Sequence, residues 1–549
     1  MNLKAPVNRR TPYASRGAEG LPNSRSVWSA GVHPRFSYSV HGANCLGPGG
    51  PRSEVGWPLR IAYNLLADAP RRTTVAVSPS VRIGCGSNLH PVNSPASASA
   101  ANESHSPRPA TPVPRRQFLA GTGAALAGLA LPAVHAAGTD AIRLALIGCG
   151  GRGSGAAANA FDSPHGPVQM IAMADLFPDR LAHAHTALSE KYARQMDVPS
   201  ERRFTGFTAW RQAIDCLRPG DVAMLTGYAG FRPAQLEYAV ARGVNVFMEK
   251  SFATDPPAVR RVIAASEAAQ PKNLKIAAGL QCRHSRNRHE LIRRIRDGEL
   301  GQLELIRAYR MQPCGWLPKR PPTEPELPWQ IRHFTDFFWV SGGLFAEMNI
   351  HQIDEICWLK DAYPVTAHGV GGRAVNNTDC GQGLDSFTIE WTFADGTKAL
   401  DVVRWLPKCH TEFATWVHGA KCAAQFSGDT HEGTVHIYKD QRCARDNIVW
   451  RAPREEITPW QAEWDNLLLA IREDRPHNEG KRAALSNLAD IMGRAAVHSG
   501  QVITWEDAMA SNFSFCPNID QLTENSPPPV AADAQGRYPV PVPGEWKEI

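Results

Sequence analysis

The stretch Ile142-Arg-Leu-Ala-Leu-Ile-Gly148-Cys-Gly-Gly-Arg-Gly153 decides the fold of this 549-residue chain. Its first six residues are a β-branched and leucine-rich run, which is typical of a strand buried in a parallel sheet. The pattern G-x-G-x-x-G follows without a gap, and the small, Ala-rich residues 154–161 favour a helix packed closely on that sheet. A strand, a glycine-rich turn and a helix in this order predict a Rossmann domain that binds a dinucleotide.

Each glycine of the turn has a separate task in such a domain. Gly148 allows the tight turn, Gly150 lets the backbone approach the pyrophosphate, and Gly153 lets the helix sit close to the strand. Gly151 and Arg152 complete the turn at the N-terminus of the helix, where backbone N–H groups favour a negative charge. We therefore predict that these five residues bind the cofactor.

A second expected strand, residues 169–174, ends at Asp175. An acid in this place binds the adenosine ribose 2′-hydroxyl and favours NAD. Asp179 and Arg180 stand close by, however, and an arginine there accepts the 2′-phosphate of NADP. The sequence thus predicts NAD as the cofactor, with NADP as the alternative.

The α/β alternation continues to about residue 285, so residues 141–285 are assigned to this domain. Further strands are expected at 221–226, 244–248 and 275–279, with helices between them at 233–242 and 256–269. Polar pairs follow the last two strands, namely Glu249-Lys250 and Arg283-His284. Ligands bind outside the carboxyl ends of the strands in doubly wound sheets, so these pairs are site candidates.

Residues 286–516 show a different pattern and are assigned to an α+β domain with a largely antiparallel, open sheet. Turn signals such as Asp395-Gly396 separate strand-like runs, and two amphipathic helices follow. The runs lie at 304–310, 365–370, 386–393, 398–405, 412–418 and 423–426, and the helices at 460–472 and 482–499. The Pro-rich residues 517–549 are predicted to form an extended tail.

One stretch of the second domain combines an acid and a histidine. Gly342-Gly343 form a turn, and Glu347, His351 and Asp354 follow at spacings of four and three. In a helix these three side chains share one face. The pKa of histidine lies near neutrality, which suits a general base for an alcohol, and Glu347 would orient it or polarise the hydroxyl.

Five segments together resemble the Gfo/Idh/MocA family, named for glucose–fructose oxidoreductase and inositol dehydrogenase. They are IRLALIGCGGRGSG, the acid in MADLFPDR, GFRPAQLEYAVARGVNVFMEKSFATD, GLQCRH and GGLFAEMNIHQIDEICWL, and the similarity covers residues 141–516. The resemblance implies an oxidoreductase that moves a hydride from a secondary hydroxyl of a sugar, sugar derivative or cyclitol to NAD or NADP. It also implies homo-dimers or tetramers paired through the open sheet.

The resemblance also assigns roles to single residues. In the family a Glu-Lys-Pro segment supplies a lysine that reaches the nicotinamide and the substrate hydroxyl. This places Glu249 and Lys250 at the cofactor and makes Lys250, Glu347 and His351 the predicted catalytic residues. Ser251 replaces the proline that fixes the backbone after the lysine, and Glu347 replaces the usual aspartate. These two departures leave open a non-catalytic, sugar-binding relative.

Five weaker candidates for substrate contact are Arg283, His284, Trp329, Arg332 and Asp354. Arg283 and His284 either touch the substrate or form a structural ion pair. Trp329 and Arg332 suit sugar stacking and hydroxyl binding, but Trp329 fits a core position equally well. Asp354 is either a structural residue or a substrate contact.

Residues 115–136 resemble a twin-arginine (Tat) export signal, opened by Arg115-Arg116-Gln-Phe-Leu. A short apolar stretch and small residues up to Ala136 follow, although Pro114 and Ala120 depart from the usual pattern. An apolar core helix is the alternative. The signal predicts passage through the Tat machinery to the periplasm, and a non-functional leader would leave the protein in the cytoplasm.

Export would also change how the cofactor is used. An exported enzyme has no free pool of nicotinamide, so a tightly bound cofactor is physically sensible. Some relatives keep such a cofactor and recycle it during glycoside cleavage, which makes glycoside cleavage an alternative activity.

Residues 1–114 are rich in Ser, Pro, Arg and Gly and show no sustained helix or strand period. Because no Met follows Met1 before Met170, they are interpreted as a mis-called extension, with a genuine disordered extension as the alternative. They hold 12 Lys and Arg against 4 Asp and Glu, so the part from Gln117 onward carries −4 although the whole chain carries +6. That acidic remainder predicts no nucleic-acid binding.

The remaining composition argues against a metal site and against a membrane anchor. The 12 cysteines are scattered without a C-x-x-C pair, so no metal site is predicted. The apolar part of the leader is too short to span a bilayer, so no stable membrane anchor is expected.

Overall fold

The apolar run Ile142–Ile147 forms β1, a central strand of the six-stranded parallel sheet in the first domain. The computed structural model describes residues 140–314, 317–374, 381–428 and 434–549, so the interpreted extension (1–114) and leader (115–136) lie outside the described residues. Strand β1 pairs in parallel with β2 (Val168–Asp175) on one side and β4 (Val222–Leu225) on the other.

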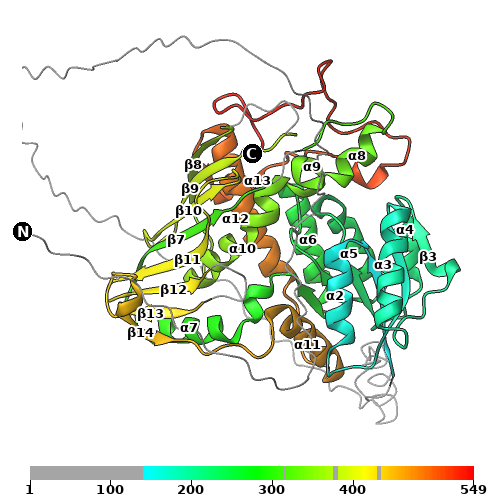
Figure 1. Ribbon diagram of the computed structural model, residues 1–549, viewed down its shortest axis with the longest axis horizontal. Coiled ribbons are helices and arrows are strands. Elements are labelled where there is room, and N and C mark those ends of the chain that lie inside the picture. Colours follow the sequence, from blue (N-terminus) through cyan, green and yellow to red (C-terminus); the bar gives the residue numbers. More distant parts are fainter. Residues whose placement is uncertain (1–139, 315–316, 375–380, 429–433) are drawn as a thin grey trace, which may run out of the picture. The chain divides into compact units, whose positions relative to one another are not determined.

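The first sheet has the strand order β3-β2-β1-β4-β5-β6, which is that of a Rossmann domain. The order changes direction between β1 and β4, and such sheets bind ligands beyond the carboxyl ends of these strands. Helices accompany the sheet, in cyan and green in Figure 1. The other elements are β3 Arg203–Thr205, β5 Asn245–Met248, β6 Ile276–Ala278, α2 Gly151–Phe161, α3 Pro178–Lys191, α4 Ala209–Asp215, α5 Arg232–Ala241 and α6 Pro256–Ala269.

Helix α2 begins inside the glycine motif, at Gly151, rather than at residue 154 as the Ala-rich run suggested. No side chain caps its N-terminus, which Gly150 precedes in extended conformation. The N–H groups of the first turn therefore remain available to an anion, as the dinucleotide interpretation requires.

A nine-stranded sheet forms the second domain, with the order β14-β13-β12-β11-β7-β10-β9-β8-β15. Its pairs are antiparallel except for β7 and β10, which run parallel. The largely antiparallel sheet expected from the sequence is therefore confirmed. The strands are β7 Leu303–Met311, β8 Thr366–Gly372, β9 Ser386–Thr392, β10 Lys398–Arg404, β11 Glu412–Gly419, β12 Ala423–Ser427, β13 His436–Tyr438, β14 Ile448–Arg451 and β15 Ile503–Thr504.

Two long helices connect the sheets. Helix α10 (Gly343–Lys360) is buried along most of its length and contacts β7. Helix α12 (Gly480–Ser499) contacts both α10 and α6, so it joins the two domains (Figure 1). The shorter helices are α7 Arg286–Arg296, α8 Glu326–Arg332, α9 Phe338–Ser341 and α13 Trp505–Ala510.

Helix α11 (Pro459–Arg472) lies in the sequence range that was assigned to the second domain, but it packs on the first domain. It packs against α2, and its buried Trp464 stacks on Phe247 of β5 with ring centroids 4.5 Å apart. An apolar helix face can be read from a sequence, but the sheet that covers it cannot, because the contact joins residues far apart in the chain.

The tail, residues 517–549, contains the single turn η6 (Ile519–Gln521) and is otherwise irregular. It is nevertheless attached to the second domain. The hydroxyl of Tyr538 donates to Glu326 of α8 over 2.8 Å, and Glu548 is 1% exposed. The tail therefore takes part in the packing around α8 and α12.

Candidate active site

The glycine-rich turn is shaped by its own packing. Gly148 has φ +97°, and a Cβ there would lie 2.5 Å from Gly227 N. A Cβ on Gly153 would overlap Gly148 O, whereas a Cβ on Gly150 would meet no protein atom within 4 Å. Gly148 and Gly153 are thus required by the fold, and Gly150 presents bare backbone at the start of α2.

Asp175 stands at the end of β2, beside this turn. Its carboxylate accepts the backbone N–H of Cys149 over 2.6 Å and that of Phe177 over 2.8 Å. Burial raises the pKa of Asp175, which these two hydrogen bonds oppose. Each carboxylate oxygen can accept a further hydrogen bond, so a ribose hydroxyl remains a compatible partner.

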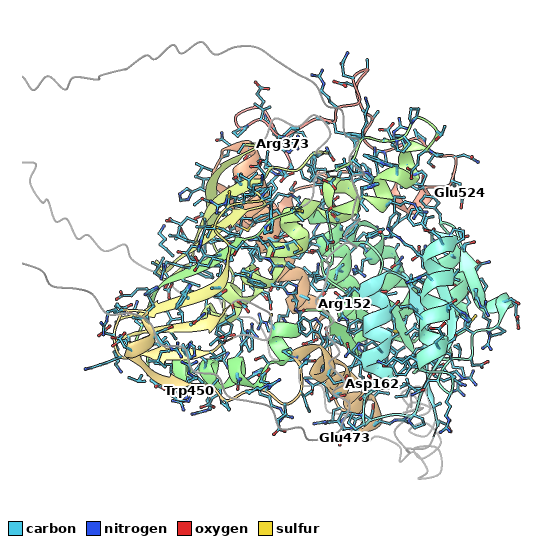
Figure 2. The ribbon with its side chains drawn as sticks, viewed as in Figure 1. Arg152, Asp162, Arg373, Trp450, Glu473 and Glu524 are labelled. Atoms are coloured by element: carbon cyan, nitrogen blue, oxygen red, sulfur yellow. The ribbon has the colours of Figure 1, made fainter. Side chains whose placement is uncertain are left out.

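Arg152, in the first turn of α2, pairs with two acids of different origin. Its Nε lies 2.5 Å from Glu249 Oε1, and its Nη2 lies 3.4 Å from Glu463 Oε2 of α11. Figure 2 shows Arg152 in the middle of the view, near the side of the first domain that faces the second. The structure therefore joins two of the predicted cofactor residues, Arg152 and Glu249, directly.

Lys250 and Glu347 form the central contact of the site. Lys250 follows β5, and its Nζ donates to Glu347 Oε2 over 2.7 Å and to Glu347 O over 2.6 Å. Their side chains are 18% and 8% exposed, so the ion pair is largely shielded from water. His351, one turn further along α10, is also buried. The helix expected from the spacing of these residues is present.

The backbone after Lys250 is held by hydrogen bonds instead of a proline ring. Ser251 is fully buried, and its hydroxyl donates to Ala346 O in α10 over 2.7 Å. The N–H groups of Phe252 and Ala253 both donate to Asn487 Oδ1 of α12 over 2.8 Å. We expected the backbone after Lys250 to be less constrained without a proline, but these three hydrogen bonds hold it in place. The Lys250–Ser251 peptide bond is cis.

Arg232, the first residue of α5, links this segment to the end of β4. Its Nε donates to Ser251 O over 3.0 Å, and its two other nitrogens donate to Leu225 O and Gly227 O. Burial lowers the pKa of Arg232 to about 10, and the carboxylate of Glu249 opposes this. The guanidinium therefore stays charged at neutral pH. The sequence marks Arg232 only as part of the segment GFRPAQ that carries the family resemblance, and its burial and its contacts with the ends of β4 and β5 are seen only in the structure.

Tyr228 and Arg180 form a second polar contact of the candidate site. Arg180 donates to the Tyr228 hydroxyl, and the Tyr228 ring stacks on Phe334 at 4.5 Å. Burial raises the pKa of Tyr228; Arg180 lowers it, and the charges of Asp175 and Glu347 raise it further. Arg180, the possible partner of a 2′-phosphate, is thus engaged by a tyrosine in this structure.

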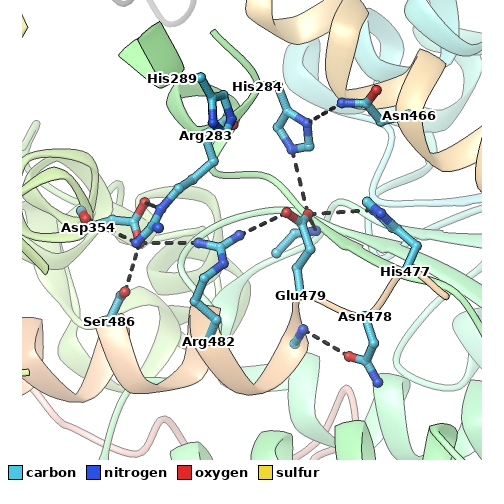
Figure 3. Close-up of polar contacts among 12 residues, drawn as sticks. Arg283, His284, His289, Asp354, Asn466, His477, Asn478, Glu479, Arg482 and Ser486 are labelled. Atoms are coloured by element: carbon cyan, nitrogen blue, oxygen red, sulfur yellow. Dashed lines mark hydrogen bonds and ion pairs between the residues drawn. The ribbon is translucent and has the colours of Figure 1, made fainter. Parts of the chain in front are cut away.

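Arg283 and Asp354 pair with each other. Arg283 Nε and Nη2 lie 2.7 Å from Asp354 Oδ2 and 2.9 Å from Asp354 Oδ1, and Oδ1 also accepts from Ser486 and Arg482 of α12 (Figure 3). Burial would raise the pKa of Asp354, but the charges of Arg283 and Arg482 outweigh it and lower the pKa. This geometry favours the structural alternative for both residues.

His284 takes part in the neighbouring half of the same network. Asn466 Nδ2 lies 2.9 Å from His284 Nδ1, and Glu479 Oε2 lies 3.6 Å from His284 Nε2 (Figure 3). Arg482 and His477 also lie within 4 Å of the Glu479 carboxylate. The end of β6 is therefore tied to the start of α12 by charged side chains, which is a domain-joining role.

Trp329 and Arg332 lie on α8. Trp329 is 2% exposed and packs between Phe337 and Tyr538, which favours the core alternative. Arg332 reaches the first domain, where its Nη2 lies 2.9 Å from Asp179 Oδ1. Its guanidinium also lies 3.9 Å from the centre of the Phe177 ring. Arg332 thus connects α8 to α3, on the side of the turn where Asp175 stands.

The described residues contain no group of three or more His, Cys, Asp or Glu side chains that could hold a metal ion. Within the same part of the chain, no helix has the length and apolar character needed to cross a membrane.

No family model matches this chain, and no curated protein matches it in sequence. Solved structures do match it over the whole of their own length. Aldose-aldose oxidoreductase from Caulobacter crescentus, complexed with glycerol, is 18% identical with a TM-score of 0.52, and the match covers 66% of this chain and 100% of that one. The fold implied by the resemblance to the Gfo/Idh/MocA family is therefore confirmed.

Two inositol dehydrogenases show the same likeness. Myo-inositol 2-dehydrogenase from Lactobacillus plantarum is 18% identical, with a TM-score of 0.50 over 66% of this chain and 99% of that one. Scyllo-inositol dehydrogenase from Lactobacillus casei, with bound NAD(H) and scyllo-inositol, is 20% identical with the same TM-score and coverage. At these identities the similarity concerns the fold.

Proposed function

We propose that this chain is a nicotinamide-dependent oxidoreductase that acts on a secondary hydroxyl of a sugar, sugar derivative or cyclitol. The Lys250–Glu347 ion pair carries the proposal. Lys250 follows β5, and β5 belongs to the same sheet as β1, the strand that leads into the glycine-rich turn. The structurally similar oxidoreductases that act on sugars and cyclitols support the same class of substrate.

The residues at the turn fit a dinucleotide. The start of α2 has uncapped N–H groups, Gly150 leaves space for a pyrophosphate, and Asp175 has oxygens directed at the turn. NAD is favoured over NADP, because Asp175 would repel a 2′-phosphate and Arg180 is already bonded to Tyr228. When bound at these residues, NAD would supply the acceptor for the hydride of the carbinol carbon.

The proton of the hydroxyl is assigned to the chain's own residues. His351 accepts it as general base, while the ammonium of Lys250 donates a hydrogen bond to the same oxygen and stabilises the negative charge that develops there. Glu347 holds the Lys250 ammonium by two contacts and so fixes where that charge stands. The oxidised product is a ketone, and the proton leaves through His351.

The test is NADH formation by the purified chain from residue 137 onward with a panel of polyols, cyclitols and sugars. Absorbance at 340 nm that depends on one substrate class, and that is lost in His351→Asn, supports the proposal. No binding of NAD or NADP to a folded chain would contradict it. Substrate binding without turnover, unchanged by the His351 variant, would favour a sugar-binding protein.

A second candidate function is glycoside cleavage with a retained, recycled NAD. The Arg332–Asp179 pair is the observation that favours it, since it ties α8 to α3 next to Asp175. In such a reaction a bound NAD would supply the oxidant for the first step and, once reduced, the reductant for the last, so no NADH would accumulate. Mass spectrometry of a co-purifying cofactor, with glycoside turnover in the absence of added NAD, distinguishes this function from the first.

Export through the Tat machinery and assembly into dimers or tetramers are part of the same proposal. The twin-arginine segment supports export, and the open nine-stranded sheet supports assembly. Sequencing the N-terminus of the protein from a periplasmic fraction tests the first, with Ala137 expected as the first residue. Light scattering of the purified chain tests the second, and a monomer would contradict it.

A further inference from the structure

A buried arginine of α12 connects the two segments that carry the candidate catalytic residues. Arg494 is 1% exposed. Its Nη2 donates to Thr254 O over 3.0 Å, and its Nη1 donates to Gly342 O over 3.2 Å. Its Nε donates to Glu548 Oε1 of the tail over 3.1 Å. Because the guanidinium is planar, these bonds run in fixed directions and set the positions of three segments together.

The two carbonyls that Arg494 holds lie next to the candidate site. Thr254 is four residues beyond Lys250, and Gly342 is five residues before Glu347, at the start of α10. Gly342 has φ +84°, and a Cβ there would lie 2.9 Å from Arg494 Nη1. The arginine is therefore packed directly against the turn that starts α10.

Glu548 supplies the negative charge that Arg494 requires. It is 1% exposed, and its Oε1 also lies 3.4 Å from Nδ1 of the fully buried His498. The indole nitrogen of Trp546 lies 3.3 Å from its other oxygen. Burial would raise the pKa of Glu548, but the charge of Arg494 outweighs it and lowers the pKa to about 2. The carboxylate is therefore ionised at neutral pH.

Asp490 is the other acid near Arg494, but it carries less negative charge at neutral pH than Glu548. Asp490 lies one turn earlier on α12 and is fully buried, and burial raises its pKa to about 8, with Arg494 opposing. Asp490 is thus mostly protonated at neutral pH, whereas Glu548 is not. A buried cation with one ionised partner depends strongly on that partner.

We propose that Arg494, held in place by Glu548 of the tail, is a positioning residue that sets the distance between Lys250 and Glu347. Its effect on turnover rests on the proposed function. The tail is then a required part of the active-site scaffold, although neither residue touches substrate or cofactor. Losing the Glu548 charge loosens Arg494, and the 250–254 segment and the start of α10 separate from each other before the glycine-rich turn is affected.

The test compares Glu548→Gln, which keeps the shape and removes the charge, with Glu548→Asp, which keeps the charge. Arg537→Ala serves as the matched control, because it removes an ion pair of the same tail that lies on the surface. We expect Glu548→Gln to lower kcat at least tenfold, with the Kd for NAD changed less than twofold. Glu548→Asp should recover part of kcat, and Arg537→Ala should behave as the unmodified protein.

Hydrogen exchange decides the inference independently of any activity. In Glu548→Gln, amides in 251–255 and 343–348 should exchange at least fivefold faster, while those of β1 and β4 are unchanged. This measurement remains decisive if the unmodified protein turns over no substrate. Unchanged exchange in both segments, or an equal increase throughout the chain, would overturn the proposal. Normal kcat in Glu548→Gln would overturn it as well.

Discussion

The two halves of the candidate site are built in different ways. The cofactor half is built mainly on one stretch of backbone, the turn from Gly148 to Gly153, beside which the Asp175 carboxylate accepts a backbone N–H. The chemical half joins Lys250 and Glu347, which are 97 residues apart, through buried charged side chains. The first half depends on the absence of side chains, and the second depends on their ion pairs.

Because of this difference, different kinds of substitution should disrupt the two halves. A glycine that approaches another backbone tolerates no Cβ, so the cofactor half fails by steric overlap. A buried ion pair tolerates changes of shape better than loss of charge, so the chemical half fails by desolvated, unpaired charge. Four experiments use this contrast, from the largest expected effect to the smallest.

Replacing Lys250 by Met should produce the largest effect, and it should lower kcat far more than the affinity for NAD. We expect kcat to fall by about 10³-fold, because a positioned proton-handling group contributes about 10²–10⁴. The Kd for NAD should change less than threefold, as measured by fluorescence titration. Lys481→Met is the matched control, because Lys481 forms an exposed pair with Glu267. Loss of NAD binding together with kcat would contradict the separation of the halves.

Gly148→Ala and Gly150→Ala probe the cofactor half. The first places a Cβ 2.5 Å from Gly227 N at positive φ, so it should lower the free energy of unfolding by about 3 kcal/mol and abolish NAD binding. The second meets no protein atom within 4 Å, so it should leave stability within about 0.5 kcal/mol and still weaken NAD binding at least tenfold. Urea unfolding and titration with NAD measure both. Equal stability losses would refute the distinction.

Asp490→Asn should show the electrostatic character of the chemical half through pH. Burial raises the pKa of Asp490 to about 8; Arg494 and Lys250 oppose the rise, and Asp401 and Glu347 reinforce it. Since this pKa exceeds the unfolded value of 3.8, the stability that Asp490 contributes is complete below pH 3.8 and is lost as pH rises through 8.

The variant should therefore gain stability relative to the unmodified protein as the pH rises from 4 to 8, by at most about 1.4 kcal/mol for each pH unit. Urea unfolding at several pH values measures the difference in free energy. Parallel stability curves across this range would show that Asp490 does not titrate in the folded protein as inferred.

Arg332→Ala should have the smallest effect. Its pair with Asp179 is half exposed, and such pairs contribute about 0–1 kcal/mol. We expect NADH to dissociate less than fivefold faster in stopped-flow measurements, with the unfolding free energy almost unchanged. In 1 M NaCl the difference should disappear, because salt screens exposed charges. A difference that persists in high salt would point to the Phe177 ring contact instead.

The Rossmann sheet was predictable from the sequence because each of its signals is local. The apolar strand, the G-x-G-x-x-G turn and Asp175 fall within 34 residues, and the structure places them together. The spacing of Glu347 and His351 predicted a helix, and α10 is that helix. The parallel pairing of β7 with β10 was not predictable, because strand pairing depends on partners far along the chain.

The burial and hydrogen bonds of Ser251 and Arg232 could not be predicted from the sequence. From the sequence, Ser251 was a lost proline, and in the structure it is a buried hydrogen-bond donor to α10. Arg232 belongs to the segment GFRPAQ that carries the resemblance, but nothing in that segment indicates that its side chain donates to Ser251 O and Gly227 O. Arg494 and Glu548 are similar cases, since the charge of a side chain can be read from the sequence and its burial cannot.

The sequence by itself determined the Rossmann fold, the location of its turn and the candidate residues Lys250, Glu347 and His351, because backbone geometry and helical spacing are local properties. The tertiary structure decided which charges are paired, namely Lys250 with Glu347, Arg283 with Asp354, and Arg494 with Glu548 of the tail. The physical reason is that a buried charge is stable only beside its partner, and the fold determines which residue becomes that partner.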